Sequence, residues 1–313
     1  MSQMLAFVFP GQGSQSLGML ADLAAAQPLV RETFDEASEG AGIDLWALSQ
    51  QGPEDQLNQT EFTQPALLAA GVAVWRTWLS QGGACPAVLA GHSLGEYAAL
   101  VAAGCLGLSD GARLVRERGR LMQQAVPAGT GAMAAVLGAE DAMVEEVCAA
   151  AASGEGVVVP ANYNSPGQIV IGGDAAAVDR ALAELAARGV RKAVKLAVSV
   201  PSHTPLMREA ADRLGDVMAA MRWQDASIPV VQNVDARIHS SVADVRAALV
   251  RQLYQPVLWT QCVQTLVARG ANVIGECGPG KVLSGLAKRI DKSVEARALG
   301  TAAEFEAAIE AWK

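Results

Sequence analysis

The pattern of apolar and polar residues predicts a parallel α/β sheet in the first third of the chain. Residues 5–9 form an apolar run that ends at the glycine-containing turn 10–13, and residues 87–90 form a second run that ends at 91–95. Each turn leads into a helical pattern, an order typical of parallel α/β sheets. Ligands of such sheets bind beyond the carboxyl ends of the strands, so both turns are predicted to line a site.

The middle of the chain predicts a smaller domain with a ferredoxin-like β-α-β-β-α-β order. The predicted strands span residues 132–137, 157–161, 168–171 and 193–198, and the predicted helices span 139–151 and 175–188. Turn and breaker residues at 127–131 and 200–202 mark its two ends. We therefore expect an α/β fold in which a hydrolase-like larger domain with a parallel sheet, residues 1–128 and 199–313, carries an inserted α+β domain, residues 129–198. A cleft is expected between the two domains.

Composition and charge narrow the classes of function. The chain has 313 residues, of which 51% are hydrophobic and 4% aromatic, and this suits helices packed on a sheet. The net charge of −8 argues against a nucleic-acid partner, because phosphate binding requires a positive surface. The apolar run at 4–9 is too short to cross a bilayer, and no export signal is recognisable. We expect a cytoplasmic protein that does not bind membranes.

The cysteines indicate no covalent framework and no metal site. There are five of them, widely spread and without a C-x-x-C pair. Neither a disulfide scaffold nor a zinc site has this spacing. We expect no metal and no cofactor.

Ser93 is the candidate nucleophile. It stands in Gly91-His92-Ser93-Leu94-Gly95, a G-x-S-x-G pattern that places serine on a sharp turn between a strand and a helix. The N–H of Leu94 would then lack a helical partner and could donate to a developing oxyanion. The alternative is an ordinary serine that caps the helix.

His203 is the candidate base, since an activated serine needs one and the chain has only three histidines. His92 lies in the same tight turn as the serine, where adjacent side chains diverge, and His239 lies in a polar stretch. His203 follows an apolar run and opens a helical segment, which would place it at the carboxyl end of a strand.

Arg118 is the most informative polar residue. It falls within the apolar stripe of a helix predicted at about residues 110–125. That stripe contains Leu114, Leu121, Met122 and Ala125, and the opposite face carries Arg113, Arg116 and Arg120. Burying a guanidinium is costly without a partner, so Arg118 either pairs with an internal acid or binds a ligand anion. Spacing alone leaves both interpretations open.

Six motifs in a fixed order carry a family resemblance. They are Phe9-Pro10-Gly11-Gln12-Gly13-Ser14-Gln15, Gly91-His92-Ser93-Leu94-Gly95-Glu96, Asn162-Tyr163-Asn164-Ser165-Pro166-Gly167-Gln168, Val200-Pro201-Ser202-His203, Arg251-Gln252-Leu253-Tyr254 and Glu276-Cys277-Gly278-Pro279-Gly280-Lys281. Through them the chain resembles the malonyl-CoA:acyl carrier protein transacylases of fatty acid synthesis. The resemblance runs from end to end of the chain.

The resemblance implies a ping-pong transfer of malonyl through an ester on Ser93, with His203 as the base. The substrates would be malonyl-CoA and the phosphopantetheine thiol of acyl carrier protein, and Gln12 and the Leu94 N–H would hold the oxyanion. Gln252 would orient the histidine, largely by a carbonyl, because no acid completes a triad.

The resemblance also implies how the substrate is held. Arg118 would pair with the free malonyl carboxylate through two hydrogen bonds. Asn162 would line the cleft from the small domain, although a turn or packing explains an asparagine there almost as well. His92 is assigned to the substrate side of the site.

Other functions remain open at this point. A serine esterase or thioesterase shares G-x-S-x-G but usually has its histidine near the chain end. A discrete acyltransferase of a polyketide pathway would look much the same, and a non-catalytic carrier-binding module would keep the fold. Docking of an acidic carrier needs a local positive patch, for which the candidates are Arg188, Arg191, Lys192, Lys281, Lys288 and Arg289. A monomer is the default expectation.

Overall fold

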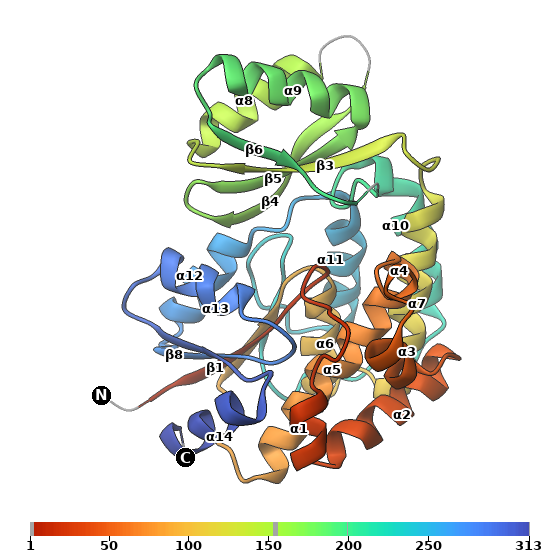
Figure 1. The fold of residues 1–313 in the computed structure, drawn as a ribbon, viewed down its shortest axis with the longest axis vertical. Helices are drawn as coiled ribbons and strands as arrows, with labels where there is room; N and C mark the ends of the chain where they lie inside the picture. Colours follow the sequence, from red (N-terminus) through yellow and green to blue (C-terminus); the bar gives the residue numbers. More distant parts are fainter. Residues whose placement is uncertain (1–2, 153–155, 199, 313) are drawn as a thin grey trace.

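The computed structural model describes residues 3–152, 156–198 and 200–312 and divides into two sheets with their helices (Figure 1). Position 199, where the second segment of the larger domain was predicted to begin, lies outside the described residues, as do positions 1, 2 and 313. Within the described residues, no helix is both long enough and apolar enough to cross a membrane.

The larger sheet is parallel and has the strand order β7-β2-β1-β8-β9. Its strands are β1 (Leu5–Phe9), β2 (Val88–Gly91), β7 (Val230–Val231), β8 (Val273–Glu276) and β9 (Glu295–Ala298). Every residue of β1 is buried, as expected for the central strand of a sheet covered on both faces. Side chains alternate along β1: Phe7 and Phe9 pack on one face, and Ala6 and Val8 pack on the other.

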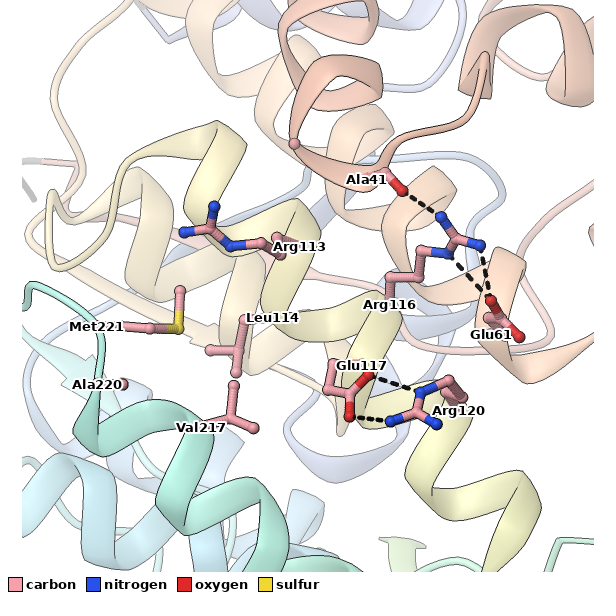
Figure 2. Close-up of a pocket in the computed structure, with 11 residues that line it drawn as sticks. Ala41, Glu61, Arg113, Leu114, Arg116, Glu117, Arg120, Val217, Ala220 and Met221 are labelled. Atoms are coloured by element: carbon pink, nitrogen blue, oxygen red, sulfur yellow. Dashed lines mark hydrogen bonds and ion pairs between the residues drawn. The ribbon is translucent and has the colours of Figure 1, made fainter.

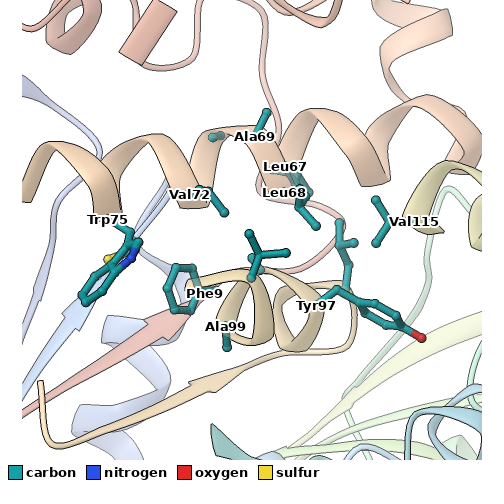
Figure 3. Packing of buried hydrophobic residues seen from close by; sticks show 14 of the residues in the cluster. Phe9, Leu67, Leu68, Ala69, Val72, Trp75, Tyr97, Ala99 and Val115 are labelled. Carbon is teal, nitrogen blue, oxygen red and sulfur yellow. The ribbon is translucent and has the colours of Figure 1, made fainter. Parts of the chain in front are cut away.

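Helices cover both faces of this sheet. The face that carries Phe9 packs against α5 (Thr60–Ser80), α6 (Leu94–Ala102) and α7 (Leu108–Gln124), and Figure 3 shows Phe9 among Leu68, Val72 and Trp75. The opposite face packs against α12 (Trp259–Ala268) and α13 (Val282–Ile290). The other helices of the larger domain are α1 (Ala21–Ala26), α2 (Leu29–Ala41), α3 (Leu45–Gln51), α4 (Glu54–Leu57), the 3-10 turn η1 (Pro205–Met207), α10 (Arg208–Ala219), α11 (Val242–Tyr254) and α14 (Ala302–Ala311).

The smaller sheet is antiparallel, with the order β4-β5-β3-β6. Its elements follow the chain as β3 (Gly131–Leu137), α8 (Asp141–Ala151), β4 (Val158–Ser165), β5 (Gln168–Asp174), α9 (Ala175–Ala187) and β6 (Lys192–Lys195). Both helices cover the outer face, away from the larger domain (Figure 1). The predicted fold class, a parallel α/β domain with an inserted ferredoxin-like domain, is confirmed.

Three strand ends differ from the prediction by three residues or more. β5 was predicted at residues 168–171 and continues to Asp174. β4 continues four residues past Ala161 to Ser165, because its last residues keep pairing with β5 as far as Gln168. The larger domain also bonds to this stretch: the Tyr163 N–H donates to the Val257 carbonyl at 2.9 Å, and the Val257 N–H donates to the Ala161 carbonyl at 2.9 Å. β6 ends at Lys195 rather than at residue 198, and the chain then leaves the sheet. The two domains are therefore joined by main-chain hydrogen bonds beside the segment that follows α11.

Candidate active site

Ser93 occupies a strained turn between β2 and α6. Its φ is +52°, a left-handed value that is uncommon for any residue other than glycine. The turn is possible only because the flanking residues lack side chains: a Cβ on Gly91 would lie 1.9 Å from the Gly95 carbonyl carbon, and a Cβ on Gly95 would lie 2.0 Å from the Phe9 carbonyl oxygen. The sequence motif thus produces the sharp turn expected of an exposed nucleophile.

His203 lies beside this serine, although 110 positions separate them. The Ser93 Oγ and the His203 Nε2 are 2.8 Å apart. The His203 Nδ1 lies 2.6 Å from the main-chain carbonyl oxygen of Gln252. A carbonyl can only accept, so Nδ1 carries the hydrogen, and the lone pair of Nε2 is left to accept the serine proton.

The route by which His203 reaches the serine differs from the one expected. It does not follow the end of a strand, because β6 ends at Lys195 and belongs to the small sheet. His203 instead sits in the connection that leads to η1 and α10, with φ +62° and with its N–H donating to the Leu253 carbonyl at 2.9 Å. The end of α11 therefore positions the histidine through the carbonyls of two successive residues, Gln252 and Leu253.

Arg118 projects inward from α7 and is 1% exposed. Its guanidinium donates to the side-chain oxygens of Gln64 and Gln252, each at 2.9 Å, and approaches the Ser93 Oγ at 3.3 Å. It also lies over the Tyr97 ring, 5.2 Å from the centroid. In the part of the chain that the structure describes, Arg118 forms no ion pair, and its Nε has no hydrogen-bond partner.

Burial sets the protonation states in this pocket. Desolvation first, and then the positive charge of Arg118, lower the pKa of His203 to about 3. The imidazole is therefore neutral at physiological pH, as a general base must be. Burial also lowers the pKa of Arg118, which nevertheless stays charged, since arginine keeps its proton in proteins.

Donors for an oxyanion lie on both loops that line the serine. Leu94 is the first residue of α6, and within the described residues its N–H has no acceptor. The N–H of Gln12 is likewise without an acceptor there, whereas the Gln12 side-chain amide donates to the Thr60 Oγ1 at 3.3 Å. A Cβ on Gly11 would lie 2.5 Å from the His92 carbonyl oxygen, so the loop of Gln12 packs directly on the serine turn.

A cleft of about 340 Å³ between the two domains contains these groups. Its lining includes the predicted site residues Gln12, His92, Ser93, Leu94, Arg118, Asn162 and His203. Gln252 does not line the cleft and acts from behind His203. Asn162 reaches it from β4 and is 6% exposed.

His92 lies next to the serine in the chain and contacts the small domain. Its Nε2 lies 2.8 Å from the Asn164 Oδ1 of the small domain, and its ring meets Trp259 edge-on at 5.4 Å. Burial lowers the pKa of His92, so it is a neutral contact between the domains at the cleft wall.

Sequence reasoning missed a buried polar layer beneath the serine. Asn233, Glu96 and the side chain of Gln252 are each 0% exposed and are joined by hydrogen bonds. Glu96 closes the motif that contains Ser93, which is the one signal that could have drawn attention to it. Asn233 follows the short strand β7 and has no local signal.

A second hollow, of about 590 Å³, lies on the outer side of α7 (Figure 2). Its arginines face carboxylates: Arg116 lies 2.9 Å from Glu61, and Arg120 lies 2.5 Å from Glu117. It contains neither the serine nor the histidine. The hollow is larger than the cleft, but its arginines are partly exposed and paired with carboxylates, as on an ordinary solvated surface.

The cleft therefore combines a serine activated by a neutral imidazole, unpaired N–H donors and an unbalanced buried cation. Such an arrangement can form an acyl-serine ester and can select acyl groups that carry an anion. Across the described residues, no group of three His, Cys, Asp or Glu side chains is placed to hold a metal ion.

Comparison with known proteins points to one family. The acyl transferase domain family matches residues 6–302. The chain is 54% identical over 304 residues to the malonyl CoA-acyl carrier protein transacylase of Salmonella typhimurium, covering 97% of this chain and 98% of that one. It is 72% identical, with a TM-score of 0.98, to the crystal structure of malonyl-CoA:acyl carrier protein transacylase from Xanthomonas oryzae, covering 99% of each chain.

A second solved structure contains a carrier. It is described as a type II PKS acyl-carrier protein in complex with its malonyl-transacylase, and it is 51% identical to this chain with a TM-score of 0.97. The match covers 99% of this chain and all of that one.

Proposed function

This chain belongs to the acyl transferase family, and we propose that it transfers malonyl from malonyl-CoA to the thiol of acyl carrier protein through an ester on Ser93. The enzyme class expected from the sequence, a malonyl-CoA:acyl carrier protein S-malonyltransferase, is confirmed by its relatives. The transfer supplies the chain extender for fatty acid synthesis. The observation that carries this proposal is the buried Arg118, which lies 3.3 Å from the Ser93 Oγ without a carboxylate of its own.

The first half-reaction loads the enzyme. The Nε2 of His203 removes the proton from the Ser93 Oγ as this oxygen attacks the thioester carbonyl carbon. The N–H groups of Leu94 and Gln12 stabilise the resulting oxyanion. Collapse of the tetrahedral intermediate breaks the carbon–sulfur bond, the imidazolium returns its proton to the departing sulfur, and malonyl-Ser93 and CoA remain.

The second half-reaction reverses these roles. The pantetheine thiol of the carrier gives its proton to His203 and attacks the ester carbonyl, and collapse returns the proton to the Ser93 oxygen. The main-chain carbonyl of Gln252 holds the imidazole in place throughout. A carbonyl stabilises an imidazolium less than a carboxylate does. The weaker stabilisation is sufficient here, because the attacking group is a thiol.

Arg118 contributes both selection and activation. A guanidinium meets a carboxylate with two hydrogen bonds, which fits malonyl and leaves the cation unpaired with acetyl. The positive charge of Arg118 also disfavours protonation of His203. When the malonyl carboxylate pairs with Arg118, that repulsion is offset, and His203 becomes a better base in the complex that has the correct substrate.

The carrier docks at the mouth of the cleft. Leu196 and Val282 line the cleft from opposite domains and are 39% and 52% exposed. Of the cations proposed for docking, Arg191, Lys192, Lys281, Lys288 and Arg289 are exposed. Arg188 is already paired with Glu184 and Glu146, so it contributes less to the attraction of an acidic carrier. We place this reaction in the cytoplasm and assign it to a monomer.

Mass spectrometry of the intact protein tests the function. Wild-type protein mixed with equal amounts of malonyl-CoA and acetyl-CoA is expected to gain malonyl on Ser93, to keep it in buffer, and to lose it to added phosphopantetheinylated carrier. Ser93→Ala is expected to gain nothing. Release of free malonate without a carrier would show an esterase instead, and the ratio of rates with fatty-acid and polyketide carriers identifies the pathway.

A further inference from the structure

The strained main chain of Ser93 is held from both sides by buried side chains. Its N–H donates to the Asn233 Oδ1 at 2.7 Å, and its carbonyl oxygen accepts from the Gln252 Nε2 at 3.0 Å. A left-handed residue other than glycine costs roughly 1–3 kcal/mol and persists only where its surroundings hold it. These two contacts are therefore candidates for what keeps the nucleophile in its reactive position.

One carboxylate oxygen anchors both of those contacts. The Glu96 Oε2 accepts from the main-chain N–H of Asn233 at 2.8 Å and from the Gln252 Nε2 at 3.0 Å. Asn233 is fixed at its other end, since its Nδ2 donates to the Gly91 carbonyl at 2.7 Å. Glu96 is 0% exposed and lies one turn along α6 from the serine.

The same network extends to the base and to the selecting cation. The main-chain carbonyl of Gln252 accepts from the His203 ring, and its side-chain oxygen accepts from Arg118 at 2.9 Å. A shift of Gln252 would therefore move the serine turn, the imidazole and the guanidinium together. Glu96 is the group that orients the amide of Gln252 toward Ser93 and Arg118.

We propose that Glu96 is a positioning residue for the acyl transfer, and that it acts as the common hydrogen-bond acceptor for Asn233 and Gln252 rather than as a charge. This inference rests on the proposed function. The two bonds converge on one oxygen, and in the described part of the chain the other oxygen, Oε1, has no partner. Burial raises the pKa of Glu96 to about 7, so a substantial fraction of the folded protein carries a protonated Glu96 at neutral pH.

Two variants of similar size separate the acceptor from packing. Glu96→Leu fills the space without an acceptor, whereas Glu96→Gln keeps a carbonyl oxygen that can accept both bonds. Because small displacements of reacting groups cost about a hundredfold in rate, Glu96→Leu is expected to lower kcat for malonyl transfer by that factor with little change in KM. Glu96→Gln is expected to restore kcat to within about fivefold of wild type, since its geometry is conserved.

The kinetics of these variants test the positioning role and the acceptor role of Glu96 separately. Wild-type kcat in folded Glu96→Leu would overturn the positioning role, and a kcat of Glu96→Gln as low as that of Glu96→Leu would overturn the acceptor role in favour of charge. If Glu96→Leu does not fold, Asn233→Ala, which removes the acceptor of the Ser93 N–H and leaves Glu96 intact, is expected to lower kcat alone; unchanged kcat would again contradict the inference. Failure of wild-type protein to form malonyl-Ser93 would instead contradict the proposed function.

Discussion

The two faces of α7 place arginines in opposite electrostatic situations. On the outer face, Arg116 and Arg120 are partly exposed and each contacts a carboxylate, as Figure 2 shows. On the inner face, Arg118 is 1% exposed and contacts only neutral oxygens and the Tyr97 ring. Both faces belong to one helix of 17 residues, so the difference arises from what packs against each side.

This difference separates structural cations from functional ones. An exposed ion pair contributes between about 0 and 1 kcal/mol, because water solvates both charges well in its absence. A buried cation without an anion is costly, so a chain that retains one has a use for the missing anion. The hollow on the outer face is larger than the cleft, but its charges are paired and do not indicate a function. The unpaired charge of Arg118 identifies the cleft as the site.

Arg118→Ala removes the buried cation of the inner face. Without the guanidinium, malonyl loses its partner and acetyl no longer leaves a charge unpaired, so the preference for malonyl over acetyl is expected to fall by up to about ten-thousandfold. Competition between the two CoA esters, read as the ratio of acyl-enzymes by mass spectrometry, measures it. Retention of the wild-type preference would contradict the role of Arg118, while persistent acetyl transfer would show that Ser93 and His203 remain in place.

Arg118→Lys keeps the positive charge and removes the planar fork of the guanidinium. A lysine offers a point charge in place of two parallel hydrogen bonds, so kcat/KM for malonyl transfer is expected to fall about tenfold to a hundredfold. Steady-state kinetics with malonyl-CoA and a fixed carrier concentration test this. A variant as active as wild type would mean that charge alone suffices.

The pH dependence of stability tests the buried acid on the inner side. The pKa of Glu96 is raised from 4.5 to about 7, so the folded state holds its proton where the unfolded chain has lost it. The stability contributed by this proton is fully present below pH 4.5, and on the order of 3 kcal/mol of it is lost as pH rises to about 7. His203 acts oppositely: its pKa is lowered to about 3, so its contribution is present above pH 6.5 and lost as pH falls.

Glu96→Gln separates the contribution of Glu96 to the pH dependence of stability from that of His203. The difference in unfolding free energy, variant minus wild type, is expected to increase from pH 4.5 to pH 7, because only wild type loses stability by releasing this proton. Urea unfolding at several pH values gives this difference. A difference that is independent of pH would show that Glu96 is ionised in the folded protein throughout.

The smallest effect is expected on the outer face. Arg120→Ala removes an exposed pair with Glu117 and is expected to change the unfolding free energy by less than about 1 kcal/mol. Malonyl transfer should stay within about twofold of wild type, since surface pairs far from the cleft do not touch substrate. A large loss of selectivity in this variant would contradict the assignment of a structural role to the outer face of α7 and a functional role to the inner face.

Local chemistry explains which features could be predicted from the sequence. The turn of Ser93 depends on Gly91 and Gly95, two neighbours in the same pentapeptide. The inward direction of Arg118 follows from the spacing of a single helix. The family resemblance itself rests on six short motifs, each of which can be read without knowing where the others lie.

Features that combine distant segments could not be predicted in this way. The sequence suggested that His203 follows a strand, whereas it lies in a connection whose position is set by the carbonyls of Gln252 and Leu253. Asn233 carries no sequence signal, because its role depends on reaching the Ser93 N–H across 140 positions. The main-chain hydrogen bonds between β4 and the larger domain likewise depend on Val257, which is distant from β4 in the sequence.

Short-range information predicted the first two strands of the parallel sheet, the order of elements in the small domain, the serine turn and the family, because each follows from propensities, periodicities and motifs within a few residues. Packing of distant segments brought the reacting groups together at the serine, left Arg118 without a carboxylate partner and joined Glu96 to Gln252. Burial and hydrogen bonding are properties of a closed environment, and that environment exists only after segments from β2, α7, β7 and α11 have packed around one site.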